Sequence, residues 1–230
     1  MAPRRKSEPN ARALPVSSDR RQRRSAELRE RLFRAALKLF AEKGFAKTTV
    51  EDITDAADVG KGTFFNYFPS KDHILIAFGQ MQLSKLEEAV KNMRQNSEPI
   101  PAFLKDLSVR MTAEPARWPD VVRAILQANL STSPVRSAMQ ENHARAQALL
   151  TQVIQMGQQR GECRKDVPAS ELAQVFRQTV FGTLLIWSLY GDATLPARIH
   201  TALNVLWLGL APREDTPAVM KPETRKEICP

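Results

Sequence analysis

Residues 48–71 read TTVEDITDAADVGKGTFFNYFPSK, and this segment restricts the possible fold more than any other part of the chain. A threonine followed three residues later by an acidic residue forms a capping box, which starts a helix, and the spacing occurs at Thr48 and again at Thr49. Asp58 tolerates the left-handed backbone that ends a short helix, and Gly60 is an acceptable N-cap for the next one. The segment therefore predicts two short helices joined by a tight turn.

The second short helix is expected over residues 61–68, because Pro69 follows directly and cannot continue it. Phe64 and Phe68 are four residues apart, so they share one helix face and should pack inward. The other side chains are left facing outward or partly outward. A helix-turn-helix of this kind places its second helix in the DNA major groove, so the segment indicates a protein that reads duplex DNA.

The outward side chains of this segment are our candidates for DNA contacts. Lys61, Thr63 and Asn66 carry groups suited to base edges, and Phe65 is suited to a thymine methyl group. Gly62 lies among them and belongs to the same predicted surface. Phosphate contacts that set the register are expected from Thr48, Thr49, Tyr67 and Lys71.

The chain resembles the TetR family of bacterial transcriptional regulators over roughly residues 25–78. The resemblance is carried by Thr48-Thr49-Val50-x-Asp52-Ile53, by Lys61-Gly62-Thr63-Phe64-Phe65-Asn66-Tyr67-Phe68-x-Ser70-Lys71, and by Leu39-Phe40-x-x-x-Gly44-Phe45. The chain departs from the family at Asp58, Gly60 and Phe65, where Gly, Ser and Tyr are usual. The resemblance implies an all-α fold of about nine helices, with a three-helix DNA-binding domain followed by a helical domain for ligand binding and dimerisation. It also implies a regulator, commonly a repressor, that binds a palindromic operator as a dimer and is released by a small molecule.

Much of the net charge of +9 lies in an N-terminal arm, residues 1–24, which carries eight basic and two acidic side chains. The arm is rich in Pro, Arg and Ser, has no apolar stretch that could serve as a signal peptide, and has a composition that favours disorder. Beside a helix-turn-helix, we expect it to tether the protein to DNA phosphates or to the minor groove. The alternative is a solubilising tail without a role in binding.

The remaining sequence predicts helices separated by proline-containing breaks, without a strand pattern. We expect a helix-turn-helix domain over residues 25–71, a helical ligand-binding and dimerisation domain over 72–211, and a disordered tail over 212–230. A long helix from Ser70 to about Asn96 would belong to both domains.

The last two predicted helices are apolar on more than one face and so need cover on more than one face. A partner subunit is the natural cover, and the resemblance implies a four-helix dimer interface made by these helices. The predicted interface is Phe176, Val180, Leu184, Trp187, Leu203, Leu206 and Trp207. The alternative is that both helices are central in the monomer.

The middle helices combine apolar and aromatic residues with isolated polar ones, the usual composition of a small-molecule pocket. The predicted pocket residues are Met81, Trp118, Ile125, Asn129, Met139, His143 and Phe176. Since no cluster of charged residues is expected to be buried there, an apolar or aromatic effector is favoured. Ordinary core packing is the competing explanation for each of these residues.

Other function classes find little support in the sequence. No apolar run is long enough to span a membrane, and Cys163 and Cys229 lack metal-binding spacing, so a cytoplasmic protein with reduced thiols and no metal or cofactor is expected. His73, His143 and His200 are far apart and match no catalytic pattern, so an enzyme is not expected. The stronger rival is a ligand-independent DNA-binding or chromosome-organising protein on the same fold.

Overall fold

The structure is a computed structural model that describes residues 16–211 except 132, 192 and 193. The described residues form only helices and connecting loops. The elements are α1 (Val16–Lys43), α2 (Val50–Ala56), α3 (Lys61–Tyr67), α4 (Asp72–Asn96), α5 (Ile100–Ala113), a 3-10 turn η1 (Pro115–Arg117), α6 (Pro119–Ser131), α7 (Ser133–Gln159), α8 (Ala169–Tyr190) and α9 (Leu195–Leu210).

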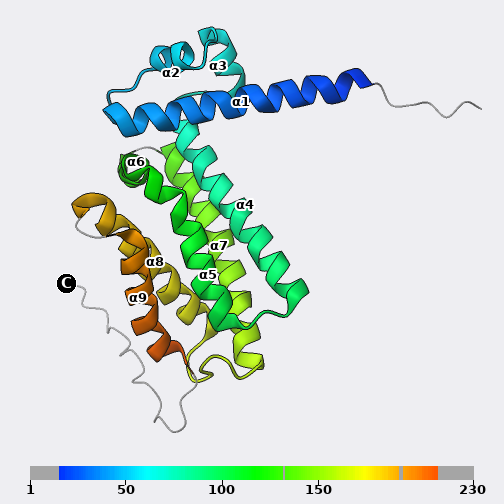
Figure 1. The fold of residues 1–230 in the computed structure, drawn as a ribbon, viewed down its shortest axis with the longest axis vertical. Helices are drawn as coiled ribbons and strands as arrows, with labels where there is room; N and C mark the ends of the chain where they lie inside the picture. The colour runs from blue at the N-terminus through cyan, green and yellow to red at the C-terminus, as the bar shows by residue number, and fades with distance from the viewer. Residues whose placement is uncertain (1–15, 132, 192–193, 212–230) are drawn as a thin grey trace, which may run out of the picture.

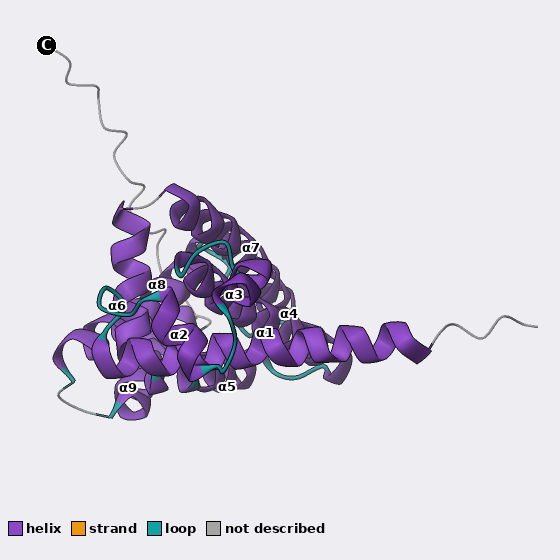
Figure 2. Cartoon of the chain, turned by 90° about the horizontal axis from the view of Figure 1, so that it is seen from above, coloured by secondary structure: helices purple, strands orange, loops and turns teal. Residues whose placement is uncertain are grey.

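The helices form two groups, with α1, α2 and α3 at one end and a larger bundle of α5 to α9 below them (Figure 1). Helix α4 begins beneath the first group and runs down along the bundle, where it packs against α7. Helix α7 also packs against α8, and α8 packs against α9. Seen from above, α1 crosses over the bundle and its N-terminal turns project beyond it (Figure 2). The predicted all-α fold is confirmed.

Local signals account for the boundaries of the short helices. Thr49 is the N-cap of α2, and it exchanges both capping-box hydrogen bonds with Asp52, so the second of the two predicted registers is the one used. Gly44 ends α1 with a φ of 83°, and Asp58 occupies the turn between α2 and α3 with a φ of 48°. Gly60 is the N-cap of α3, without a side-chain cap.

A shared hydrophobic core joins the first helix group to the bundle. Phe40, Phe64 and Phe68 from the first group are buried in one cluster with Ile74 of α4 and Val121 of α6. A second cluster lies further along the bundle, where α4, α5, α7, α8 and α9 meet. The position of α3 therefore depends on both α4 and α6, because their side chains form the core on which it rests.

Two expectations at the ends of the chain need correction or lie beyond the described residues. Helix α1 starts at Val16, so residues 16–24 are helical and do not form part of a disordered arm. The many arginines in residues 16–24 are compatible with a helix, because arginine is a good helix former and α1 is already nucleated further along. The rest of the arm, 1–15, and the predicted tail, 212–230, lie outside the described residues.

None of the described helices combines the length and apolarity needed to cross a bilayer.

Candidate DNA-binding surface and small-molecule cavity

Helix α3 presents one exposed face opposite its buried one. Phe64 and Phe68 are almost fully buried, with ring centroids 5.8 Å apart, as the four-residue spacing predicts. On the outer face Lys61, Phe65 and Asn66 are exposed, and Phe65 keeps 53% of its surface accessible. Around Gly62 an added Cβ would meet nothing within 4 Å, so this face is open. The exposed phenyl ring of Phe65 adds an accessible apolar group to the polar groups of this face.

The remaining residues predicted around α3 flank this exposed face. Thr63 and Tyr67 are half-buried, and the Tyr67 hydroxyl donates a hydrogen bond to Oγ of Ser25 over 3.1 Å, which ties α3 to α1. Lys61 is ion-paired with Glu51 of α2, and this pairing holds the pKa of Glu51 below its ordinary value. Thr49 is exposed at the start of α2, beside the same face.

Two residues predicted to contact phosphates instead form hydrogen bonds within the fold. Thr48 is buried, and its hydroxyl donates to the carbonyl oxygens of Leu39 and Gly44 over 3.3 and 2.8 Å. The threonine therefore closes the end of α1 and cannot reach a phosphate. Sequence spacing alone could not separate it from the exposed Thr49 beside it.

Lys71 is the second of these residues. Its Nζ donates to the carbonyl oxygens of Phe45, Ala46 and Thr48 over 2.9, 3.3 and 3.0 Å. The ammonium also lies 4.6 Å from the centroid of the Phe45 ring. Since an ammonium group has three protons, these bonds use its donor capacity and leave none for a phosphate.

The first helix group also carries exposed basic residues, one that the sequence prediction did not single out and others that it assigned to the basic arm. Lys47 is exposed in the loop before α2, and Arg20, Arg21 and Arg24 are exposed on the projecting turns of α1. A lysine two residues before the helix N-cap Thr49 was the available signal for Lys47. The arginines were recognised only as part of a basic arm, because the composition concealed that they continue α1.

A cavity of about 270 Å³ lies between α4, α5, α6, α7 and α8, and we refer to it as the α4–α8 cavity. Its wall is mostly apolar, and among the described residues Arg177 is the only charged side chain that lines it. Phe181 of α8 lines the cavity while remaining 46% exposed, so the cavity reaches the surface beside this ring. An apolar cavity with few polar groups is typical of a small-molecule site.

The predicted pocket residues divide between this wall and other places. Ile125, Met139 and Phe176 line the α4–α8 cavity. Met81 and Trp118 do not, because they pack against the core beneath α1. His143 is exposed and contacts Arg177 through Nδ1, and both burial and the Arg177 charge hold its pKa below the ordinary value. The side chain of Asn129 lies outside the described residues.

The cavity wall also contains residues that the sequence analysis missed. Gln82 of α4 and Arg177 of α8 line it, together with the apolar Phe78 and Leu86. Phe78, Gln82 and Leu86 recur at four-residue spacing, so a glutamine in an otherwise apolar helix face was the signal that could have revealed the site.

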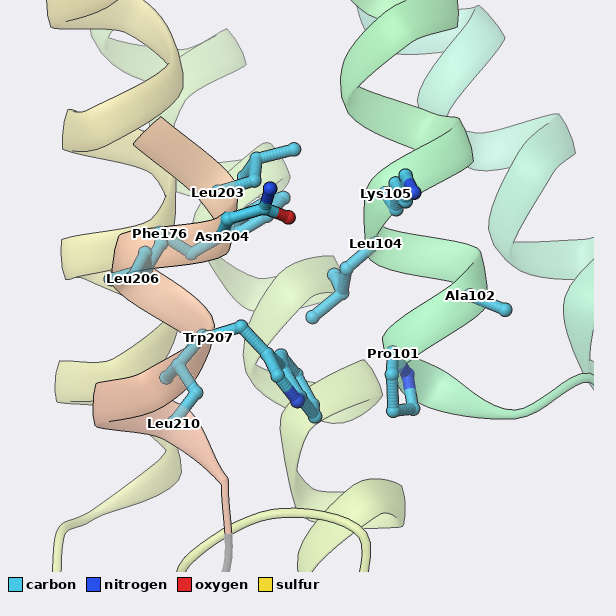
Figure 3. Close-up of a pocket in the computed structure, with 10 residues that line it drawn as sticks. All are labelled: Pro101, Ala102, Leu104, Lys105, Phe176, Leu203, Asn204, Leu206, Trp207 and Leu210. Atoms are coloured by element: carbon cyan, nitrogen blue, oxygen red, sulfur yellow. The ribbon is translucent and has the colours of Figure 1, made fainter. Parts of the chain in front are cut away.

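Of the seven residues predicted as a dimer interface, Phe176 and Leu184 are buried in the protomer and have little surface left for a partner subunit. The other five are half-buried. A groove of about 270 Å³ lies between α5 and α9. In Figure 3, Trp207 of α9 points toward Pro101 and Leu104 of α5. The groove is also lined by Phe176, Leu203 and Leu206. Val180 and Trp187 are half-buried against the neighbouring core clusters. Within the protomer these residues pack against α5 and the bundle core.

A different apolar surface is exposed on the same two helices. Val175, Ile186 and Leu189 of α8 recur at helical spacing, and Val205 and Leu208 of α9 are 67% and 75% exposed. We call these five residues the outer stripe. So many large apolar side chains are rarely left uncovered on one face of a monomer.

Comparison with known proteins places both regions in one family. Residues 32–78 match the family described as bacterial regulatory proteins, tetR family, and residues 120–203 match the tetracyclin repressor-like C-terminal domain. The HTH-type transcriptional regulator TcmR of Streptomyces glaucescens is 37% identical over 81 residues, which are 35% of this chain and only 34% of that protein. The chain thus spans about a third of this relative. The HTH-type transcriptional regulator UidR of Escherichia coli K12 is 23% identical over 168 residues, or 72% of this chain and 84% of that protein.

Solved structures extend the likeness over the full fold. Thermus thermophilus FadR, a TetR family repressor in complex with lauroyl-CoA, is 28% identical with a TM-score of 0.61, and the match covers 84% of this chain and 100% of that one. The fatty acid degradation regulator FadR of Bacillus halodurans has a TM-score of 0.69 at 20% identity, covering 79% and 95% of the two chains. The second likeness concerns the fold alone.

Proposed function

Because this chain belongs to the TetR family of bacterial regulatory proteins, we propose that it is a cytoplasmic transcriptional repressor that binds a palindromic operator as a homodimer. A small molecule that fills the α4–α8 cavity would release it from DNA. Its relatives are transcriptional regulators rather than enzymes. The observation that carries the proposal is the exposed outer face of α3, held in place by the burial of Phe64 and Phe68.

On this outer face the chemistry suits the major groove. Asn66 can form two hydrogen bonds with adenine, Lys61 can exchange its Glu51 partner for a guanine, and Phe65 can pack on a thymine methyl group. Thr49 and Tyr67 lie at the edges of the face, where hydroxyl groups would contact phosphates. Two such faces in a dimer would read half-sites about one DNA turn, ~34–36 Å, apart or at a related spacing.

Helix α4 provides the physical link between the cavity and α3. Gln82 and Leu86 of α4 line the cavity, whereas Ile74 and Leu75 in its first turns are buried in the core beneath α1 and α3. A ligand that displaces α4 would therefore move α3 relative to its counterpart in the dimer. The ligand needs only to bind the displaced arrangement more tightly to lower DNA affinity.

The effector we propose has a largely apolar body, since the cavity wall is mostly apolar. The likeness to the T. thermophilus repressor, which was solved with lauroyl-CoA, supports an apolar chain as one such body. The cavity is also the reason to prefer this proposal over a ligand-independent DNA-binding protein, whose helical domain would be packed without a space.

The outer stripe is the surface we propose for dimerisation. Val175, Ile186 and Leu189 on α8 and Leu208 on α9 would meet the same residues of a second copy, which buries one continuous apolar face. Gly182 lies within the stripe on α8, and an added Cβ there would meet nothing within 4 Å in the protomer. The open position allows close approach of a partner helix.

The first turns of α1 are proposed to bind DNA phosphates beside the operator. Arg20 and Arg24 are four residues apart, so their charges repel along the helix and a nearby polyanion would stabilise it. Deletion of residues 1–24 should weaken binding and reduce its dependence on salt. Unchanged affinity and salt slope would leave the arm as a solubilising tail.

Mapping the protein on the chromosome of its source cell tests the main proposal against its alternative. A regulator should occupy few sites, each upstream of a gene and each containing an inverted repeat. A chromosome-organising protein should instead occupy many scattered sites without a shared repeat. The Asn66→Ala variant serves as the control, because it should lose the specific sites while keeping its fold.

A further inference from the structure

Gln82 carries the least expected polar group in the α4–α8 cavity. Both of its amide atoms, Nε2 and Oε1, are buried and have no hydrogen-bond partner in the described part of the chain. The side chain lines a cavity whose wall is otherwise mostly apolar. Buried amides are nearly always paired, since an unpaired one loses its hydration without compensation.

A second buried amide lies beside Gly79, a residue of the cavity wall. Asn142 of α7 has a buried Nδ2 without a partner among the described residues. A Cβ added to Gly79 would lie 3.2 Å from this nitrogen and 2.8 Å from Cε of Met139. Gly79 lines the cavity and precedes Gln82 by three residues on α4, so both amides belong to the seam where α4 meets α7.

The charged group of the wall, Arg177, has contacts of its own. The Arg177 guanidinium donates to Oε1 of Gln147 over 3.2 Å and lies 2.7 Å from Nδ1 of the exposed His143. Its contacts are directed toward α7 at the surface. The unmet hydrogen bonds at Gln82 and Asn142 therefore concern uncharged donors and one uncharged acceptor.

We propose that Gln82 and Asn142 bind a single uncharged oxygen, a hydroxyl or a carbonyl, on an otherwise apolar effector. The amide nitrogens would donate to this oxygen while the apolar body fills the α4–α8 cavity. Because Gln82 lies on α4, the same hydrogen bonds would couple recognition of the polar group to the helix that supports α3. The inference rests on the proposed function only for this last step, since the binding preference itself requires no DNA.

Four probes with a common eight-carbon chain test the assignment: n-octane, 1-octanol, 2-octanone and octanoate. Binding to the full-length protein without DNA is measured by titration calorimetry. We expect 1-octanol and 2-octanone to bind about tenfold more tightly than n-octane, the ratio that one net hydrogen bond supplies. Octanoate should bind less tightly than 1-octanol. Equal affinities for n-octane and 1-octanol, preference for octanoate, or no binding of any probe would overturn the proposal.

The variant Gln82→Leu separates a ligand contact from a structural role. It should abolish the preference for 1-octanol over n-octane and leave the melting temperature unchanged or raised, because no protein hydrogen bond is lost. Gln80→Leu is the matched control on the exposed side of the same helix, and it should keep the preference. A lower melting temperature for Gln82→Leu, or an unchanged preference, would contradict the assignment. Failure of the probes to alter DNA affinity would instead count against the proposed function.

Discussion

The variant Lys71→Met tests whether Lys71 stabilises the fold or contacts a DNA phosphate. Methionine keeps an apolar stem but removes the three hydrogen bonds to the loop carbonyls and the contact with the Phe45 ring. The bonds to the Phe45 and Thr48 carbonyls are partly buried, whereas the Ala46 carbonyl is exposed and can be hydrated. Two partly buried bonds at about 1 kcal/mol each and a cation–π contact of about 0.5 kcal/mol give a loss of roughly 2–3 kcal/mol.

The assay for this variant has two arms. Urea unfolding of the full-length protein should show the loss of stability, and the salt dependence of DNA affinity should keep its slope at temperatures where the variant is folded. Lys47→Met is the matched control, since Lys47 is exposed in the same loop and should lower the salt slope without changing stability. If Lys71→Met is as stable as the wild type and reduces the salt slope by about one unit, our account of Lys71 is wrong.

Three further predictions concern the dimer, α2 and the buried thiol. Leu208→Glu should give a folded monomer by light scattering, whereas Leu206→Glu, on the face toward α5, should lower the urea midpoint; a dimeric Leu208→Glu would contradict the outer stripe. The hydrogen bond from Lys43 to Asp52 holds the pKa of Asp52 at about 2, below its ordinary 3.8. The ionised Asp52 carboxylate therefore contributes fully to the free energy of unfolding above about pH 4, and this contribution is lost as pH falls toward 2. Asp52→Asn should accordingly flatten the pH dependence of unfolding in that window, and an unchanged profile would refute the assignment. Burial raises the pKa of Cys163 to about 11, so in a Cys229→Ser background iodoacetamide at pH 8 should label the unfolded but not the native protein, as mass spectrometry would show.

The helix-turn-helix could be predicted because its signals are local. The capping box at Thr49, the left-handed Asp58 and the four-residue spacing of Phe64 and Phe68 each act within one or two turns of chain. Such features hold wherever the segment lies in the fold.

The roles of Thr48 and Lys71 depended on contacts that sequence does not display. Both residues occur at helix starts, where hydroxyl and ammonium groups often bind phosphates. The chain instead folds them back onto the end of α1 and the loop after it, through bonds to carbonyls 4 to 26 positions away. A backbone acceptor carries no signature in the sequence.

The proposed dimer surface shows a second reason why sequence alone was insufficient. Helix α8 is apolar on several faces, and its pattern cannot reveal which face meets α9, which lines the cavity and which remains exposed. Phe176 and Val175 are neighbours of similar hydrophobicity, yet the first is buried and the second is exposed. Only the packing of α5 and α7 against α8 and α9 decides between them.

Selection of binding sites from a random duplex pool tests the central claim most directly. The wild-type dimer should enrich an inverted repeat with half-sites about one helical turn, ~34–36 Å, apart or at a related fixed spacing. Asn66→Ala should enrich a repeat altered at one base pair of each half-site, because the exposed face of α3 reads the bases. Enrichment of no repeat, or of the same repeat by both proteins, would contradict the claim that this face reads DNA sequence.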